Sequence, residues 1–212
     1  MLKLVPEKFL IIMKTKNHLL HLPHECYEYL LVINPAKDVN KKLVAEKQMF
    51  YDDFNQKAAI NTKPHIIVAS FIAKEGMENT IVRWMQRICS KQKSFTVTLN
   101  NYGGFPPDTI YLRIQDEAPF RRLAKELSVV NAYINSSSCP PMLVTPRPHV
   151  SVADNLSEEI FFKALTQYAH KSFHESFLVN ELLLLKRKDG FEAPKPVIVF
   201  ALQPQVDELV NY

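Results

Sequence analysis

Glycine is scarce in this sequence, and its scarcity excludes one way of binding phosphate. The chain of 212 residues has 4 glycines, namely Gly76, Gly103, Gly104 and Gly190. A dinucleotide-binding G-x-G-x-x-G turn and a P-loop both need glycines at fixed, close spacing, because the backbone must approach the phosphates. Neither spacing occurs in the chain. If the protein binds a phosphate, its side chains must therefore supply the contacts.

Cysteine and long apolar runs are also in short supply. The three cysteines, Cys26, Cys89 and Cys139, are odd in number and widely spaced, so they predict neither a disulfide framework nor a zinc ribbon. The apolar segment 9–13 is flanked by lysines and is too short for the core of a signal peptide or for a membrane span. We therefore expect a reducing, cytoplasmic setting and no membrane association.

The chain does contain enough apolar residues to build a sizeable core. They make up 47% of the sequence, which excludes a wholly disordered protein, and the length fits a single domain. Residues 1–26 have mixed charge and no clear period, so we expect an N-terminal extension followed by one domain over residues 27–212. The formal net charge of +4 is mild and tolerates an anionic ligand without requiring nucleic acid.

Strand-like and helix-like segments alternate along this domain. Segments rich in β-branched and aromatic residues predict strands at 27–33, 65–71, 95–99, 109–114, 149–152, 178–186 and 197–202. Apolar residues at helical spacing predict helices at 37–56, 79–88, 119–130 and 155–170. We expect loops at 100–107 and 135–148. This order of elements indicates an α+β or α/β fold with mixed strand pairing.

An internal repeat divides the domain into two similar halves. Residues 63–71 (KPHIIVASF) and 147–155 (RPHVSVADN) align without a gap, and a strand and a helix precede each copy. The repeat predicts a bilobal α+β fold with two pseudo-symmetric βαβ-type lobes and antiparallel or mixed sheets. The two histidine strands, carrying His65 and His149, would then face each other across a central cleft.

His65 and His149 are the candidate catalytic residues. An imidazole titrates near neutral pH, so one histidine can deprotonate an attacking oxygen while the other protonates the leaving oxygen. Side chains alternate along a strand, so Ser151 shares a face with His149 and can donate a hydrogen bond to a phosphoryl oxygen. The corresponding residue after His65 is Ile67. Such chemistry needs no metal and no cofactor.

The paired histidine strands, with the stretch 103–113 (GGFPPDTIYLR) between them, resemble the 2H phosphoesterase superfamily and specifically its 2′-5′ RNA ligase-like group. The resemblance covers residues 27–202. It implies metal-independent chemistry on 2′,3′-cyclic phosphates or 2′-5′ phosphodiesters, with His65 and His149 as the acid–base pair and Ser151 as a phosphate ligand. The chain departs from the family pattern at Ile67, where a hydroxyl is usual, and at Asp154, where relatives often carry a basic residue. Strand alternation predicts that Asp154 lies on the face opposite His149.

Two functions remain open on this evidence. The first is a monomeric phosphoesterase acting on RNA ends or cyclic nucleotides, and the second, favoured by the two departures, is an RNA- or nucleotide-binding module without turnover. Tyr102 and Phe105 are candidates for stacking on a base, with packing as the alternative. Lys63 and Arg147, which precede the proline–histidine pairs, are candidates for a positive cleft mouth, with a solvated rim as the alternative.

A metal-dependent hydrolase is the least supported function. His18, His21 and His24 fall at three-residue spacing and could bind a transition metal from one face of a helix. Pro23 interrupts this run, so we expect a basic tail there. No clustered set of aspartate, glutamate and histidine occurs elsewhere in the sequence.

Overall fold

The computed structural model describes residues 24–188 and 192–205. Nine strands form one sheet: β1 (Cys26–Ile33), β2 (Ile66–Lys74), β3 (Phe95–Phe105), β4 (Thr109–Ile114), β5 (Leu143–Val144), β6 (His149–Ala153), β7 (His174–Val179), β8 (Glu181–Arg187) and β9 (Lys195–Ala201). The helices are α2 (Lys37–Phe54), α3 (Lys57–Ile60), α4 (Glu78–Cys89), α5 (Ala118–Glu126), α6 (Ser128–Ser136) and α7 (Glu158–Tyr168), with a short 3₁₀ helix, η2 (Glu75–Met77), before α4.

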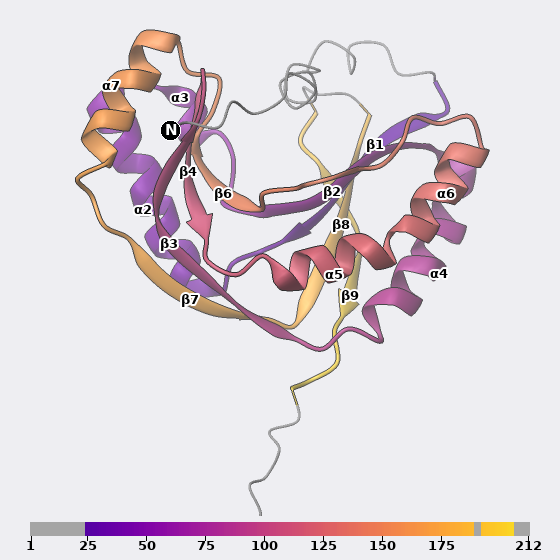
Figure 1. Cartoon of the computed structure of the whole chain (residues 1–212). Coiled ribbons are helices and arrows are strands. Elements are labelled where there is room, and N and C mark those ends of the chain that lie inside the picture. The colour runs from indigo at the N-terminus through magenta and orange to yellow at the C-terminus, as the bar shows by residue number, and fades with distance from the viewer. Residues whose placement is uncertain (1–23, 189–191, 206–212) are drawn as a thin grey trace, which may run out of the picture.

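The sheet is continuous and antiparallel throughout its ladders. Its strand order is β7-β3-β4-β6-β2-β1-β8-β9, and β5 pairs with β2 off this path. The ladders between named strands are all antiparallel, which is one of the two pairings, antiparallel or mixed, that we expected. The α+β class is therefore as predicted, but one curled sheet takes the place of two separate ones (Figure 1).

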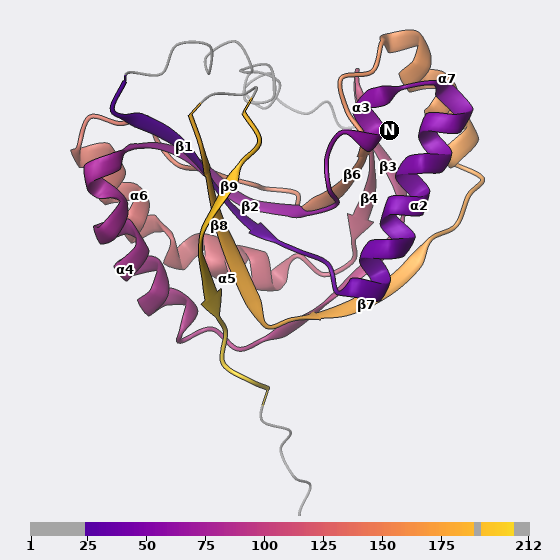
Figure 2. The ribbon, with the colours of Figure 1, turned by 180° about the vertical axis from the view of Figure 1, so that it is seen from behind.

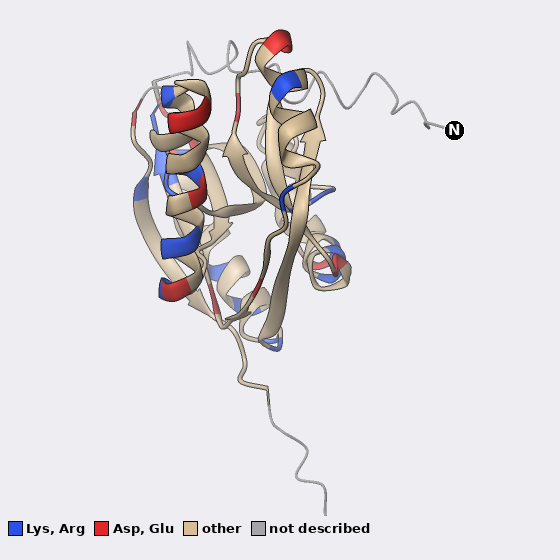
Figure 3. Cartoon of the chain, turned by 90° about the vertical axis from the view of Figure 1, so that its left-hand side faces the viewer, with Lys and Arg blue, Asp and Glu red and all other residues tan. Residues whose placement is uncertain are grey.

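Helices cover the outer side of the curled sheet. Figures 1 and 2 show α2, α3 and α7 outside the half that contains β7, β3, β4 and β6, and α4 and α6 outside the half that contains β2, β1, β8 and β9. The apolar core lies between these helices and the sheet and joins both halves in one cluster of buried side chains. The exposed side of α2 carries charges of both signs, as a helix facing solvent does (Figure 3).

The strand β3 is longer than the sequence suggested. We expected a loop at 100–107, but β3 continues to Phe105 and pairs with β4 through both members of the Gly103–Gly104 pair. A register shift between Leu99 and Tyr102, with a positive φ of 57° at Asn101, lets the strand bend and continue. The turn residues that suggested a loop therefore mark a bulge inside a strand.

Several other boundaries differ for local reasons. The predicted helix 119–130 is two helices, α5 and α6, and the predicted strand 178–186 is the β7–β8 hairpin. The predicted helix 155–170 begins later, because Ser157 is its N-cap and its hydroxyl accepts a hydrogen bond from the amide of Ile160. The predicted loop 135–148 contains β5.

The three cysteines lie within the described residues, whereas most of the predicted N-terminal extension does not. All three cysteines are buried and free. No helix in the described part of the chain is long and apolar enough to cross a membrane. The predicted extension at 1–26, with its run of histidines, lies almost wholly outside the described residues; of the histidines, His24 falls within them, and it is exposed just before β1.

Candidate active site

The two repeated histidine strands lie side by side at the centre of the sheet. Ile66 of β2 pairs with Val150 of β6, and this pairing joins the two halves. Ile66 and Val150 are both buried under the helices, so their neighbours on each strand point the other way. The four side chains on that opposite, concave face are half-buried; they are His65, Ile67, His149 and Ser151.

The antiparallel register arranges these four side chains as a square. Because Ile66 is opposite Val150, His65 lies across from Ser151 and Ile67 lies across from His149. The two histidines occupy one diagonal of the square, and Ser151 and Ile67 occupy the other. The structure thus brings His65, His149 and Ser151 together, and it places the apolar Ile67 in the same group.

Each histidine ring is held by the same backbone contact. Nδ1 of His65 lies 2.8 Å from the carbonyl oxygen of Lys63, and Nδ1 of His149 lies 2.8 Å from the carbonyl oxygen of Arg147. A carbonyl oxygen can only accept, so Nδ1 carries the proton and donates it. In the neutral ring, Nε2 is therefore the free base on both histidines.

Burial sets the charge state of both imidazoles. It lowers the pKa of His65 and the pKa of His149 from their usual value, because desolvation disfavours the imidazolium. The carbonyl of residue 63 or 147 opposes this effect by accepting from the ring. The positive form of His65 further lowers the pKa of His149, so protonation of one ring disfavours protonation of the other.

Asp154 contributes a negative charge near the histidines. It follows β6, and its carboxylate accepts a 2.6 Å hydrogen bond from the side-chain amide of Asn155. Its charge favours the imidazolium of both histidines and so raises the pKa of each, against the larger effect of burial. Asp154 therefore influences the site electrostatically.

An aromatic wall packs against the second histidine. The rings of Phe105 and Tyr111 stack with centroids 4.1 Å apart, and the ring of His149 lies 5.0 Å from each. Gly103 makes this packing possible, because a Cβ at that position would lie 2.7 Å from Cζ of Tyr111. Phe105 thus lies against the candidate site, and Tyr111 and the glycine join it there.

Tyr102, the other aromatic candidate, lies on the opposite face of β3. It is buried under α2 and α7, its ring packs edge-on against Tyr168 at 4.8 Å, and its hydroxyl donates a 2.6 Å hydrogen bond to Glu46. The structure does not bring this side chain to the histidines. Alternation along β3 separates it from Phe105, which sequence proximity alone could not show.

The cations that precede the two proline–histidine pairs are exposed. Lys63 and Arg147 offer their carbonyls to the histidine rings, and their side chains face solvent. Burial raises the pKa of Tyr111. The positive charges of Arg147 and Arg113 act in the opposite direction and lower it. Arg113 lies directly across β4–β6 from His149.

Sequence reasoning missed Tyr111 and Arg113, although both belong to a strand that was predicted correctly. Their place beside Ser151 and His149 follows from the β4–β6 register, which pairs Tyr111 with Ser151. Alternation within 109–114 indicated that residues 111 and 113 share a face. It could not indicate that this face adjoins the histidine strand.

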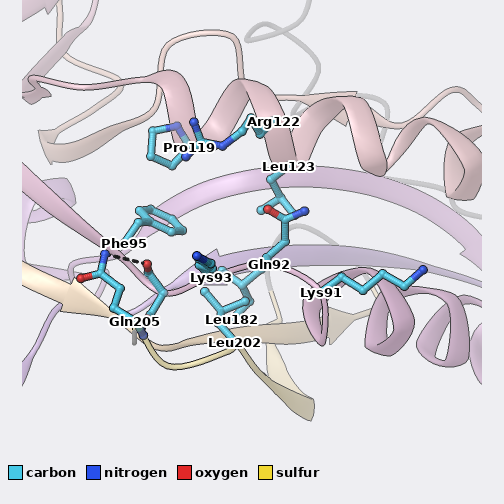
Figure 4. Close-up of a pocket in the computed structure, with 11 residues that line it drawn as sticks. Lys91, Gln92, Lys93, Phe95, Pro119, Arg122, Leu123, Leu182, Leu202 and Gln205 are labelled. Atoms are coloured by element: carbon cyan, nitrogen blue, oxygen red, sulfur yellow. Dashed lines mark hydrogen bonds between the residues drawn. The ribbon is translucent and has the colours of Figure 1, made fainter. Parts of the chain in front are cut away.

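A separate pocket of about 390 Å³ lies away from the histidine square (Figure 4). Lys93 and Arg122 approach it from the α4–β3 connection and from α5, and Leu182 and Leu202 form part of its apolar lining. Its lining contains no histidine, cysteine, aspartate or glutamate, so we do not place acid–base chemistry there. Within residues 24–188 and 192–205, no group of three or more histidine, cysteine, aspartate or glutamate side chains is arranged to hold a metal ion.

A curled antiparallel sheet with two histidine strands at its centre defines a two-histidine phosphoesterase-like fold. Residues 38–191 match the model of the 2′-5′ RNA ligase superfamily. The chain belongs to this superfamily, and the resemblance drawn from the repeat is confirmed.

Solved structures share the fold at low sequence identity. Escherichia coli LigT without ligand is 18% identical with a TM-score of 0.63, over 84% of this chain and 99% of that one. The protein TT0787 of Thermus thermophilus is 16% identical with a TM-score of 0.62, over 84% of this chain and 100% of that one. LigT complexed with 3′-AMP is 17% identical with a TM-score of 0.58, again over 84% and 99%. No curated protein has a significantly similar sequence.

Proposed function

We propose that the protein is a metal-independent phosphoesterase that opens 2′,3′-cyclic phosphates, or cleaves 2′-5′ phosphodiesters, at RNA ends or in nucleotides. The observation that carries this proposal is the matched pair of histidines, each fixed through Nδ1 by the carbonyl two residues before it. Two rings held in the same way leave two Nε2 atoms for proton transfer on one face of the sheet. A structure of the related LigT in complex with 3′-AMP supports a nucleotide as the substrate.

In the proposed reaction, the neutral imidazole of one histidine takes a proton from water as the water oxygen attacks phosphorus. The imidazolium of the other gives its proton to the departing 2′ or 3′ oxygen as the bond from that oxygen to phosphorus breaks. The product is a phosphomonoester with a free hydroxyl, and the two histidines end with their protonation exchanged. Ser151, across from His65, donates a hydrogen bond to a non-bridging phosphoryl oxygen.

Because both histidines are half-buried, their protonation depends on whether the substrate is bound. Since the pKa of each histidine is lowered, both rings are mostly neutral in the free protein near pH 7. A bound phosphate anion favours the imidazolium, so binding draws in the proton that the general acid needs. We therefore expect substrate binding to be tighter at mildly acidic pH.

The test is turnover of adenosine 2′,3′-cyclic phosphate with EDTA present. His65→Ala and His149→Ala should each lower kcat by at least about 100-fold, because each removes one proton-transfer group. His174→Ala, at an exposed histidine of β7 outside the site, is the matched control and should leave kcat unchanged. Full activity in both site variants would refute the proposal.

The alternative is a nucleotide-binding module on the same fold, and Ile67 is the observation that favours it. Ile67 is half-buried on the concave face, across from His149, where the first strand would otherwise present a hydroxyl to the phosphate. Losing one charge-assisted hydrogen bond costs about 1.5–3 kcal/mol, which corresponds to roughly 10- to 150-fold in rate.

Comparing wild type with Ile67→Thr separates the two functions. A phosphoesterase should show measurable turnover in wild type and faster turnover in Ile67→Thr. A binding module should bind adenosine 2′-monophosphate in isothermal titration calorimetry without turning over the cyclic nucleotide. Binding without turnover in both proteins would favour the module.

A further inference from the structure

Both histidine strands carry a β-bulge at the same place. Between β1 and β2, Leu31 pairs with Ala69 and Val32 pairs with Ile67, which leaves Val68 without a partner. Between β4 and β6, Ile110 pairs with Ala153 and Tyr111 pairs with Ser151, which leaves Val152 without one. Val68 and Val152 are each the third residue after a histidine. Bulges bend and twist a strand, so this pair shapes both histidine motifs.

The two bulges are held by different groups. In the first half, the amide of Thr145 donates a 2.9 Å hydrogen bond to the bulge carbonyl of Val68. In the second half, the ammonium of Lys47 lies 3.3 Å from the equivalent carbonyl of Val152 and 3.1 Å from the carbonyl of Ser151. A charged side chain of α2 thus performs in one half the task that a backbone amide performs in the other.

Lys47 is an unusual residue to find in this place. Only 4% of it is exposed, whereas Lys41 and Lys42 on the same helix face solvent. Among the described residues, no carboxylate lies within ion-pair distance of its ammonium; Asp154 acts on it only at longer range. A buried ammonium without an ion-pair partner destabilises the fold, so its presence here calls for a role in the site.

The charge of Lys47 reaches the concave face. It lowers the pKa of His65, in addition to the larger effect of burial, because a nearby cation disfavours the imidazolium. The ammonium contacts the backbone of Ser151, the residue whose hydroxyl faces the proposed phosphate position. A fixed positive charge behind that position attracts an anion without occupying its binding site.

We propose that Lys47 is a positioning residue for the second histidine strand and the fixed cation that draws the substrate phosphate to Ser151. This role rests on the proposed phosphoesterase function. The ammonium holds the bulge through the two carbonyls and so sets the direction of Ser151, while its charge favours the anionic group that the histidines act on. Residue 47 thereby links α2, on the outer side of the sheet, to the chemistry on the concave side.

The experiment compares wild type with Lys47→Met, which removes the charge and keeps the volume. Lys41→Met is the matched control, since Lys41 is an exposed lysine of the same helix. We would follow the imidazole Cε1–H signal of His65 by NMR against pH and measure the Kd of adenosine 2′-monophosphate. We would also measure the pH profile of kcat/KM for the cyclic nucleotide.

Lys47→Met should raise the pKa of His65, raise the Kd of adenosine 2′-monophosphate by about tenfold, and move the pH profile of kcat/KM to higher pH. The control should change none of these. An unchanged pKa of His65 together with an unchanged Kd in folded Lys47→Met would overturn the proposal. These two measurements need no turnover, so they test Lys47 even if wild type proves inactive and the proposed function fails.

If Lys47→Met does not fold, a second variant tests the proposal. Lys47→Arg keeps the positive charge and can donate to both carbonyls. The proposal expects this variant to retain the wild-type pKa of His65 and a Kd within about threefold of wild type. If Lys47→Arg is folded but its Kd rises by about tenfold or more, the positive charge is not what matters and the proposal is wrong.

Discussion

The buried ammonium of Lys47 makes a quantitative prediction about stability against pH. Burial lowers the pKa of Lys47 from 10.5 to about 8 in the folded protein, with the charge of Asp154 opposing the shift. In the unfolded chain the side chain is hydrated and keeps its ordinary pKa. Between these two values, the unfolded state binds a proton that the folded state has lost. The free energy of unfolding must therefore rise with pH across this window.

The size of the effect follows from the two pKa values. At about 1.36 kcal/mol per pKa unit, the shift from 10.5 to about 8 means that charged Lys47 costs roughly 3 kcal/mol of stability at pH 7. Integrating the linkage between pH 7 and 9.5 gives a gain of about 2 kcal/mol for wild type. Lys47→Met has no such proton, so the stability of the variant relative to wild type should fall by this amount over the same interval.

Urea unfolding at several pH values between 7 and 9.5 measures this difference. Trp84 is the only tryptophan of the chain, and its ring packs 5.2 Å from Tyr133, so its fluorescence reports the loss of packing. Other groups that titrate in this range contribute equally to both proteins and cancel in the difference. A difference in unfolding free energy that stays constant from pH 7 to 9.5 would refute the burial of a charged Lys47.

Three further predictions concern the concave face. Ser151→Ala should lower kcat/KM by about 10- to 150-fold through loss of a hydrogen bond to phosphate, and an unchanged kcat/KM would remove it as a ligand. In Gly103→Ala, the new Cβ would lie 2.7 Å from the Tyr111 ring and displace this ring, which packs against His149, so kcat should fall about tenfold while far-UV circular dichroism stays unchanged. A wild-type kcat would contradict that packing. Because burial lowers the pKa of His65 and His149, kcat/KM for the cyclic nucleotide should be maximal below about pH 6.5, and a maximum above pH 7.5 would contradict this assignment.

The repeat carried most of what the sequence could predict about the site. It placed His65 and His149 at equivalent points of two strands, and alternation put Ser151 and Ile67 on the same faces as these histidines. It could not tell that β2 and β6 are neighbours in one sheet, because strand pairing depends on contacts between residues distant in sequence. The sequence also could not separate Tyr102 from Phe105, because it predicted a loop at 100–107, and alternation places the two side chains on opposite faces only if this segment belongs to β3.

The position of Lys47 in α2 is a signal that the sequence contains but that the helical pattern of apolar residues did not single out. The buried face of α2 contains Val39, Leu43 and Phe50, and position 47 falls on that face between the last two. A lysine inside an apolar stripe indicates either a long side chain that reaches solvent or a buried charge with a partner. Only the structure shows the second, because the partners are backbone carbonyls of a bulge more than a hundred positions away.

The two halves match in their histidines and differ in what surrounds them. At the equivalent ladder positions, Val32 faces Ile67 in the first half, whereas Tyr111 faces Ser151 in the second. The polar groups suited to an anion thus gather on the second half, and the ammonium of Lys47 reaches the backbone of this half from α2. In the proposed substrates, the cleavable phosphate carries the negative charge and is esterified to the sugar of a nucleotide. In the proposed reaction, the phosphoryl oxygens therefore lie toward Ser151 in the second half, so a symmetric pair of histidines acts on a substrate bound in one direction.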